Sequence, residues 1–197
     1  MPTTKPQCLL LDTMVVLKLH ESNLWSQLTS SCDIFLPSSV IRNEALFYNG
    51  ENGEVVIIDL LHDAKNGAIT EIAATANDLA VLATVFDVNT FKGLGDGERE
   101  AIALINQNVL PKALFCTSDG AAIQAIVMMG RSDSATSFET LLKVNRINLP
   151  KNLEFWFKED YFKKRIREGQ VNLASGIGIT EAYRQQMLGL KPKRRKK

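Results

Sequence analysis

The sequence predicts an α/β fold with a mainly parallel sheet, and three observations support that prediction. Short apolar runs alternate along the chain with helix-like segments, which is typical of βα units. Of the 197 residues, 45% are hydrophobic, which is enough for one good core and a small second module. No apolar run approaches the ~18 residues that cross a bilayer. We therefore expect a cytoplasmic protein with no membrane partner.

Four short apolar runs are the predicted strands. Cys8–Leu11 is unbroken by polar residues, as expected of a strand that is buried on both faces. Ile34–Leu36 ends at a Pro-Ser-Ser turn, and Leu114–Cys116 ends at another polar turn. Val55–Ile58 is the fourth candidate, although the apolar residues after it could continue into a helix.

The segments between these strands are predicted helices. They carry apolar residues at helical spacing, and the second begins after a serine that can cap it. The predicted helices span roughly residues 13–22, 39–48, 68–85, 97–109 and 120–129.

The character of the chain changes near Ser132. A small polar stretch is followed by Phe155–Arg167, which mixes aromatic residues with lysine and arginine, and by a last predicted helix at Thr180–Leu188. We predict three parts: an α/β domain at residues 1–132, a helical C-terminal extension at 133–190 and a basic tail at 191–197.

Two predicted strands end close to an aspartate. Asp12 follows the first strand directly, and Asp119 follows Leu114–Cys116 after Thr117 and Ser118. Ligands of open α/β sheets bind outside the carboxyl ends of the strands. A charge beside a buried strand is costly without a partner, so two such acids on neighbouring strands favour a cation between them.

Glu44 is the third notable acid, because it interrupts the apolar stripe of the helix predicted at 39–48. Taken alone, a buried arginine or a backbone amide as its partner is the more common explanation.

A fourth acidic group opens the helix predicted at 97–109. Asp96 and Glu98 suit a helix N-terminus, where the dipole favours negative charge. Glu98 and Glu100 lie about 200° apart around a helix, so a regular helix does not aim both at one point. Together these acids predict an oxygen-lined site for Mg²⁺ or Mn²⁺. The three cysteines and two histidines have no zinc-site spacing.

Four ordered stretches carry a resemblance to a known family. They are Leu10–Thr13, Pro37–Glu44, Gly97–Leu104 and Cys116–Asp119. In this set the chain resembles, over about residues 7 to 130, the PIN-domain family of Mg²⁺- or Mn²⁺-dependent ribonucleases. That family includes the toxins of many prokaryotic toxin–antitoxin pairs. The resemblance implies a PIN-like three-layer α/β/α fold with a twisted, mainly parallel sheet, here followed by the helical extension.

The resemblance also implies roles for individual residues and partners. Metal-activated water would hydrolyse an RNA phosphodiester without a covalent intermediate, and a homodimer and an antitoxin protein are expected partners. Thr13 and Thr117 would support the site, and Asp96 is a distant candidate for the third acid. The implied catalytic residues are Asp12, Glu44, Glu100 and Asp119, and the implied metal ligands are Asp12, Glu44, Glu98, Glu100 and Asp119.

The charge distribution bears on RNA as the partner. The net charge is +1, but without Lys191–Lys197 the chain has 17 basic and 22 acidic residues, a net charge of −5. We expect RNA contacts from basic residues in two places: Lys163, Lys164 and Arg165 in the extension, and Lys193, Arg194 and Arg195 in the tail.

Two alternatives remain open at this point. The aromatic and basic segment can instead pack as an amphipathic helix on the domain, and the tail can be merely solubilising. The chain as a whole can be a PIN-like module that binds RNA or protein, with weak or no nuclease activity.

Overall fold

The computed structural model describes residues 8–50 and 52–189 and is built on a five-stranded sheet in which every pairing is parallel. β1 lies at the centre, where Leu10 is level with Phe35 of β2 and with Phe115 of β6. This confirms the predicted α/β class with a parallel sheet. In sheet order the strands are β5 (Thr70–Ile72), β2 (Asp33–Pro37), β1 (Cys8–Leu11), β6 (Leu114–Cys116) and β7 (Ala135–Thr136).

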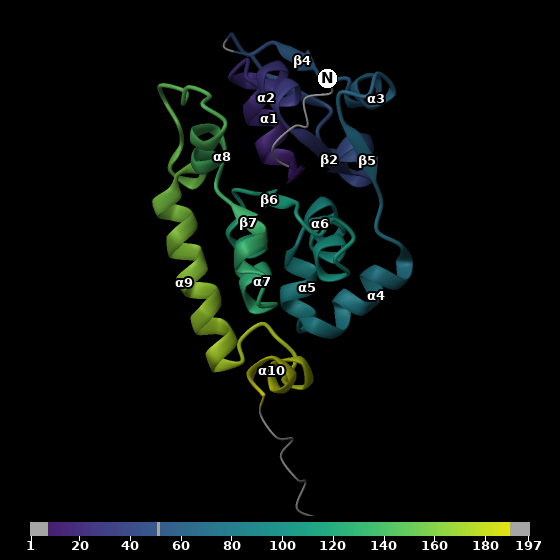
Figure 1. Cartoon of the computed structure of the whole chain (residues 1–197), viewed down its shortest axis with the longest axis vertical. Coiled ribbons are helices and arrows are strands. Elements are labelled where there is room, and N and C mark those ends of the chain that lie inside the picture. The colour runs from purple at the N-terminus through teal and green to yellow at the C-terminus, as the bar shows by residue number, and fades with distance from the viewer. Residues whose placement is uncertain (1–7, 51, 190–197) are drawn as a thin grey trace, which may run out of the picture.

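Helices connect the strands and cover the sheet (Figure 1). Between β1 and β6 they are α1 (Thr13–Glu21), α2 (Trp25–Ser31), the π-helix η1 (Val40–Glu44), α3 (Leu60–Lys65), α4 (Ala76–Val85), α5 (Val88–Gly93) and α6 (Asp96–Asn106). After β6 they are α7 (Gly120–Met128), η2 (Ser132–Ser134), α8 (Phe138–Val144), η3 (Phe155–Phe157), α9 (Glu159–Ser175) and α10 (Glu181–Leu188). In the described ranges, no helix has both the length and the apolar character to cross a membrane.

Two apolar cores lie on opposite faces of the sheet. Leu9 and Leu11 belong to one core, with α1, α2 and α8, whereas Leu10 belongs to the other, with α6 and α7. Successive side chains of a strand point to opposite faces, and all three leucines are fully buried. Helices on both faces make the arrangement three-layered and explain why β1 is an unbroken apolar run.

Three predicted elements differ in the structure. The helix predicted at 39–48 ends at Glu44, and the following residues form strand β3 (Phe47–Asn49), which pairs antiparallel with β4 (Val55–Ile57) in a separate two-stranded sheet. The strand predicted at Val55–Ile58 therefore exists but lies outside the central sheet.

The helix predicted at 68–85 begins only at Ala76. Thr75 and Asp78 form a reciprocal capping box that fixes this start. Upstream of it, Thr70–Ile72 forms β5 and pairs with the edge of β2.

The C-terminal segment packs on the same body as the rest of the chain. After the predicted boundary at residue 132, β7 joins the central sheet beside β6, and Phe138 of α8 is fully buried in a core. α9 runs along α7 (Figure 1), and a Cβ on Gly169 would lie only 2.9 Å from Cβ of Val127. Ile179 bridges back to Phe86. The segment after β7 contains the helices α8, α9 and α10, and its side chains belong to both cores.

Candidate active site

Asp12 and Asp119 lie at the carboxyl edge of the sheet, where the strand order reverses. From β1 the chain proceeds outward to β2 and β5, and it then returns to the other side of β1 to form β6 and β7. In open α/β sheets, the crevice at such a reversal is the preferred binding site. Asp12 caps α1 by accepting a hydrogen bond from the Val15 amide at 2.9 Å, and Asp119 caps α7.

Thr117 links the two aspartates. Its hydroxyl donates a hydrogen bond to Oδ2 of Asp12 and accepts one from the Asp119 amide at 3.0 Å. Asp12 is almost fully buried, and this burial raises its pKa to about 6, with a smaller contribution from the negative charge of Asp119. The predicted supporting role of Thr117 thus has a geometric basis: one hydroxyl orients both acids.

Glu44, at the end of η1, is held toward the same edge by two donors. The Thr13 hydroxyl donates to Oε2, and the Gly97 amide donates to Oε1 at 2.9 Å. A Cβ on Gly97 would lie 2.7 Å from Oε2 of Glu44, so this approach depends on glycine. The backbone-amide explanation for Glu44 therefore applies, with Thr13 as a second donor. Sequence reasoning did not single out Gly97.

Glu98 is the acid on α6 that faces the other three. Its pKa is raised to about 7, mainly by burial and also by the negative charges of Asp119, Asp12 and Glu44, whereas the hydrogen bond from the Gly95 amide opposes the shift. Four carboxylates from four separate segments are thus within electrostatic reach of one another. We refer to Asp12, Glu44, Glu98 and Asp119 as the acidic cluster.

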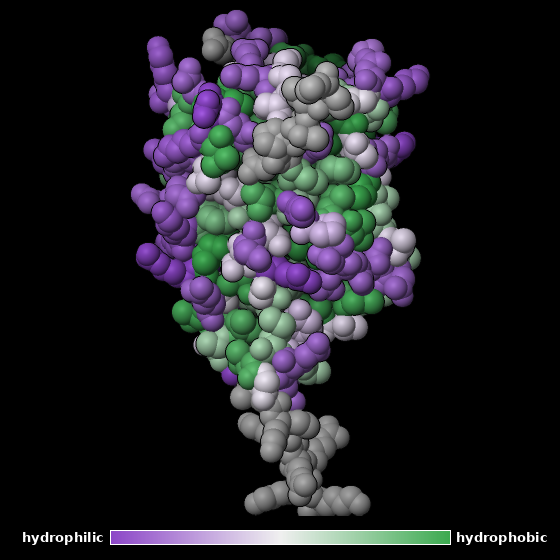
Figure 2. Space-filling model, in the orientation of Figure 1, coloured by the Kyte–Doolittle hydropathy of each residue, from purple (hydrophilic) through white to green (hydrophobic). Residues whose placement is uncertain are grey.

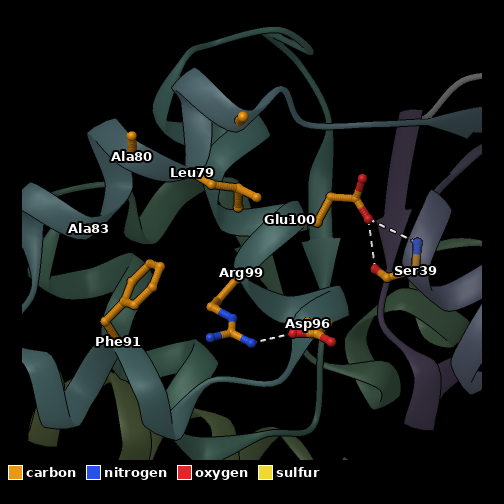
Figure 3. Close-up of a pocket in the computed structure, with 9 residues that line it drawn as sticks. Ser39, Leu79, Ala80, Ala83, Phe91, Asp96, Arg99 and Glu100 are labelled. Atoms are coloured by element: carbon orange, nitrogen blue, oxygen red, sulfur yellow. Dashed lines mark hydrogen bonds and ion pairs between the residues drawn. The ribbon is translucent and has the colours of Figure 1, made fainter.

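Glu100 lies on the other side of α6 and has a different environment. Oε2 accepts hydrogen bonds from the Ser39 amide at 3.0 Å and the Ser39 hydroxyl at 2.7 Å (Figure 3), and Oε1 accepts one from the Ala74 amide at 3.1 Å. Ser39 follows β2 and Ala74 follows β5. Glu100 thus joins two strand ends, and it is not among the acids that influence Glu98. The exposed Asp96 pairs with Arg99.

Arg165, a predicted RNA contact on α9, lies beside the acidic cluster. A Cβ on Gly120, the residue after Asp119, would lie 2.6 Å from Nε of Arg165 and 2.8 Å from the Tyr161 hydroxyl. The guanidinium lies over the Tyr161 ring, 4.8 Å from its centroid, and donates to Glu168 at 2.7 Å. Gly120 was also missed, although a glycine directly after a Thr-Ser-Asp turn is a signal of close approach.

Two of the other predicted cations lie on α9. Lys163 and Lys164 extend from α9 with mostly exposed side chains, 3.6 Å from Glu159 and 4.0 Å from Glu168. Figure 2 shows hydrophilic side chains gathered along the edge of the molecule that α9 forms. Lys193, Arg194 and Arg195 fall outside the described residues.

The acidic cluster is closed by hydrogen bonds within the protein. Both oxygens of Asp12 and both oxygens of Glu44 accept a hydrogen bond from a hydroxyl or an amide. Across residues 8–50 and 52–189, no group of three or more His, Cys, Asp or Glu side chains is placed to hold a metal ion.

Comparison of the chain with family models, curated proteins and solved structures finds no match. The PIN-domain resemblance therefore still rests on the four sequence stretches that predicted it.

Proposed function

We propose that the chain is a metal-dependent endoribonuclease with a PIN-like fold that hydrolyses RNA phosphodiesters at the acidic cluster. One observation carries the proposal: near the reversal point of the sheet, the charges of Asp12, Glu44 and Asp119 all influence Glu98, and burial with neighbouring charges raises the pKa of Asp12 to about 6 and that of Glu98 to about 7. Acids that repel one another in a crevice are stabilised when a cation joins them.

Mg²⁺ or Mn²⁺ suits the chemistry of this donor set, because carboxylate oxygens are the ligands that these ions prefer. The described side chains are not placed to hold an ion and would have to move toward one another to bind it. Asp12, Glu44, Glu98 and Asp119 would hold the ion, which when bound supplies Lewis acidity and a water of lowered pKa. Thr117 positions Asp12 and Asp119, and Thr13 and Gly97 position Glu44. For Glu100, which we also predicted as a ligand, the three donors around it favour a structural role.

RNA is the proposed substrate because a cation lies beside the acids and two exposed aromatic rings lie farther along the same segment. Arg165 contacts Gly120 beside Asp119, and it can bind a phosphate next to the one that is cut. Farther along, Phe155 is 62% exposed and Trp156 is 37% exposed, and the two rings lie edge to face, 5.0 Å apart. Exposed rings of this kind stack on unpaired bases. A cytoplasmic toxin role, a homodimer and an antitoxin partner belong to the same proposal through the resemblance alone.

Each oxygen of Asp12 and Glu44 already accepts one hydrogen bond, and this favours a second candidate. A cluster that is closed by hydroxyl and amide donors can persist without a cation. The chain would then be a PIN-like module that binds RNA or a protein and does not cut.

Cleavage of end-labelled RNA by the purified full chain tests the proposal. Single-stranded and structured RNA are each incubated with the protein and Mn²⁺ or Mg²⁺. We expect at least one of the two RNAs to be cut, and EDTA to stop the reaction. The Asp12→Asn/Asp119→Asn double variant, purified identically, controls for contaminating nuclease and should be inactive. Equal cutting by parent and double variant overturns the proposal. RNA that is bound but uncut supports the module.

A further inference from the structure

A second feature of the same sheet edge is a pocket between α4, α5 and the first turn of α6 (Figure 3). Its volume of about 650 Å³ is within the range of small-ligand sites. Its walls are mainly apolar, with three charged side chains and one serine at one end. The lining residues are Ser39, Ala76, Leu79, Ala80, Ala83, Phe91, Asp96, Arg99 and Glu100.

The pocket and the acidic cluster share the first turn of α6. Glu98 faces the acids, whereas Arg99 and Glu100, the next two residues, line the pocket. Ser39 lines it from the end of β2, and Glu44 of the same connection reaches the cluster. A chain molecule bound at the cluster would reach the pocket by passing over the first turn of α6, which separates the two.

The walls of the pocket suit a flat ring. The Arg99 guanidinium lies over the Phe91 ring, 5.4 Å from its centroid, and Asp96 holds it there. Leu79 and Ala80 of α4 lie across the pocket from these two side chains (Figure 3). An aromatic ring and a guanidinium plane both stack on heteroaromatic rings.

The charges of the pocket disfavour an anion and favour a neutral ligand with donors. Two carboxylates line it against one guanidinium. The oxygens of Glu100 already accept three hydrogen bonds, whereas the side chain of Asp96 is 74% exposed and has lone pairs to spare. An exocyclic amino group can donate to Asp96.

We propose that this pocket binds a nucleobase of the RNA strand whose phosphodiester lies at the acidic cluster, with Phe91 and Arg99 as the residues that determine base preference. This inference rests on the proposed ribonuclease function for the identity of the strand, but binding of a base can be measured separately from cleavage.

The binding test uses the four nucleoside 5′-monophosphates as probes, each titrated into ¹⁵N-labelled full chain. We expect amide shifts at Leu79, Phe91 and Arg99 with at least one nucleotide, and none with ribose 5-phosphate, which lacks the base. Ala83→Trp fills the pocket and should weaken binding at least tenfold. Val81→Trp, on the same helix but outside the pocket, is the matched control and should bind like the parent. The proposal is overturned if no nucleotide shifts these amides, or if Ala83→Trp binds normally.

The cleavage test maps cut sites on RNA of random sequence. We expect the parent and Val81→Trp to share a preference for one class of base beside the cut, and Arg99→Gln and Ala83→Trp to reduce that preference at least threefold. If the base preference beside the cut is unchanged in both Arg99→Gln and Ala83→Trp, the proposal that the pocket binds a base is overturned. Nucleotide binding without any cleavage overturns the nuclease and leaves the base pocket supported, so the two failures are distinguishable.

Discussion

Glu98 and Glu100 lie two residues apart on one helix, at one edge of the sheet, yet their surroundings are opposite in kind. Around Glu98 the neighbours are other acids, and burial together with their charges raises its pKa to about 7. Around Glu100 the neighbours are donors, two amides and a hydroxyl from the ends of β2 and β5. We assign a structural role to Glu100, whose donors join two strand ends, and the proposed cation site to Glu98 and the acids that it faces. We infer that the two sides of α6 have separate tasks.

Exchanging each glutamate for glutamine gives the sharpest test of this division. Glu98→Gln removes one of the converging charges, and we expect metal-dependent RNA cleavage to fall at least about 100-fold, as for loss of a metal ligand. Glu100→Gln should cut at close to the parent rate. Glu100→Gln should instead lower the free energy of unfolding by about 1–3 kcal/mol. The amide group of the glutamine is a donor, and it cannot accept the hydrogen bonds that the Ser39 and Ala74 amides donate to the carboxylate.

Initial cleavage rates and urea unfolding of both variants check this prediction. If the Glu100→Gln protein is folded but does not cut RNA, Glu100 belongs to the proposed metal site, which is the role that we first predicted from the sequence. A fully active Glu98→Gln protein would remove Glu98 from that site.

The choice between these two glutamates shows where sequence reasoning reaches its limit. β1 and β6 could be predicted, because strands that are buried on both faces read as unbroken apolar runs. Asp12 and Asp119 followed from them, since the ends of parallel strands meet at one edge, whereas the role of Thr117 was implied by the PIN-domain resemblance. Helical geometry shows that Glu98 and Glu100 diverge, but only the placement of other segments decides which one meets the acids.

Other misses have the same origin. β5 is a three-residue edge strand, and none of its side chains is fully buried, so it lacks the apolar signal of β1. The start of α4 depends on the Thr75 cap rather than on periodicity. The approach of Arg165 to Gly120 joins two helices that are far apart in sequence, which no local pattern indicates.

The acidic cluster should also affect how the stability of the metal-free protein depends on pH. The pKa of Asp12 is raised from 3.8 to about 6 and that of Glu98 from 4.5 to about 7. The folded protein therefore holds these protons more tightly than the unfolded chain does. The two groups stabilise the fold fully below about pH 4, and this contribution is lost as the pH rises through about 6 and 7.

Calorimetry in EDTA between pH 5 and pH 8 measures this effect. We expect the Tm of the parent to fall by several degrees more than that of Asp12→Asn, because about 1 kcal/mol shifts Tm by about 2–4 °C in a chain of this size. Mn²⁺ should restore the parent at pH 8 and have less effect on the variant. Starting at pH 5 avoids protonation of acids such as Glu71, whose pKa is lowered by Arg42. Parallel curves for the two proteins would contradict the prediction.

The smallest expected effect concerns the cation beside the cluster. Gly120→Ala places a Cβ 2.6 Å from Nε of Arg165 and displaces the guanidinium without changing the charge of the chain, whereas Gly93→Ala meets nothing within 4 Å and is the matched control. We expect Gly120→Ala and Arg165→Gln each to weaken binding of single-stranded RNA a few-fold in EDTA. Each should also lower the slope of log K against log salt by about 0.7, the share of one phosphate contact.

Fluorescence anisotropy at several salt concentrations measures both quantities, and circular dichroism confirms that each variant is folded. A slope that Arg165→Gln leaves unchanged would show that the guanidinium serves only its bond to Glu168 and its stacking on Tyr161. If Gly120→Ala and Arg165→Gln both lower the slope and Gly93→Ala does not, RNA binding depends on the position of the Arg165 guanidinium as well as on its charge. Arg165 would then compensate, at the border of the acidic cluster, for the repulsion that the four carboxylates exert on a phosphate backbone.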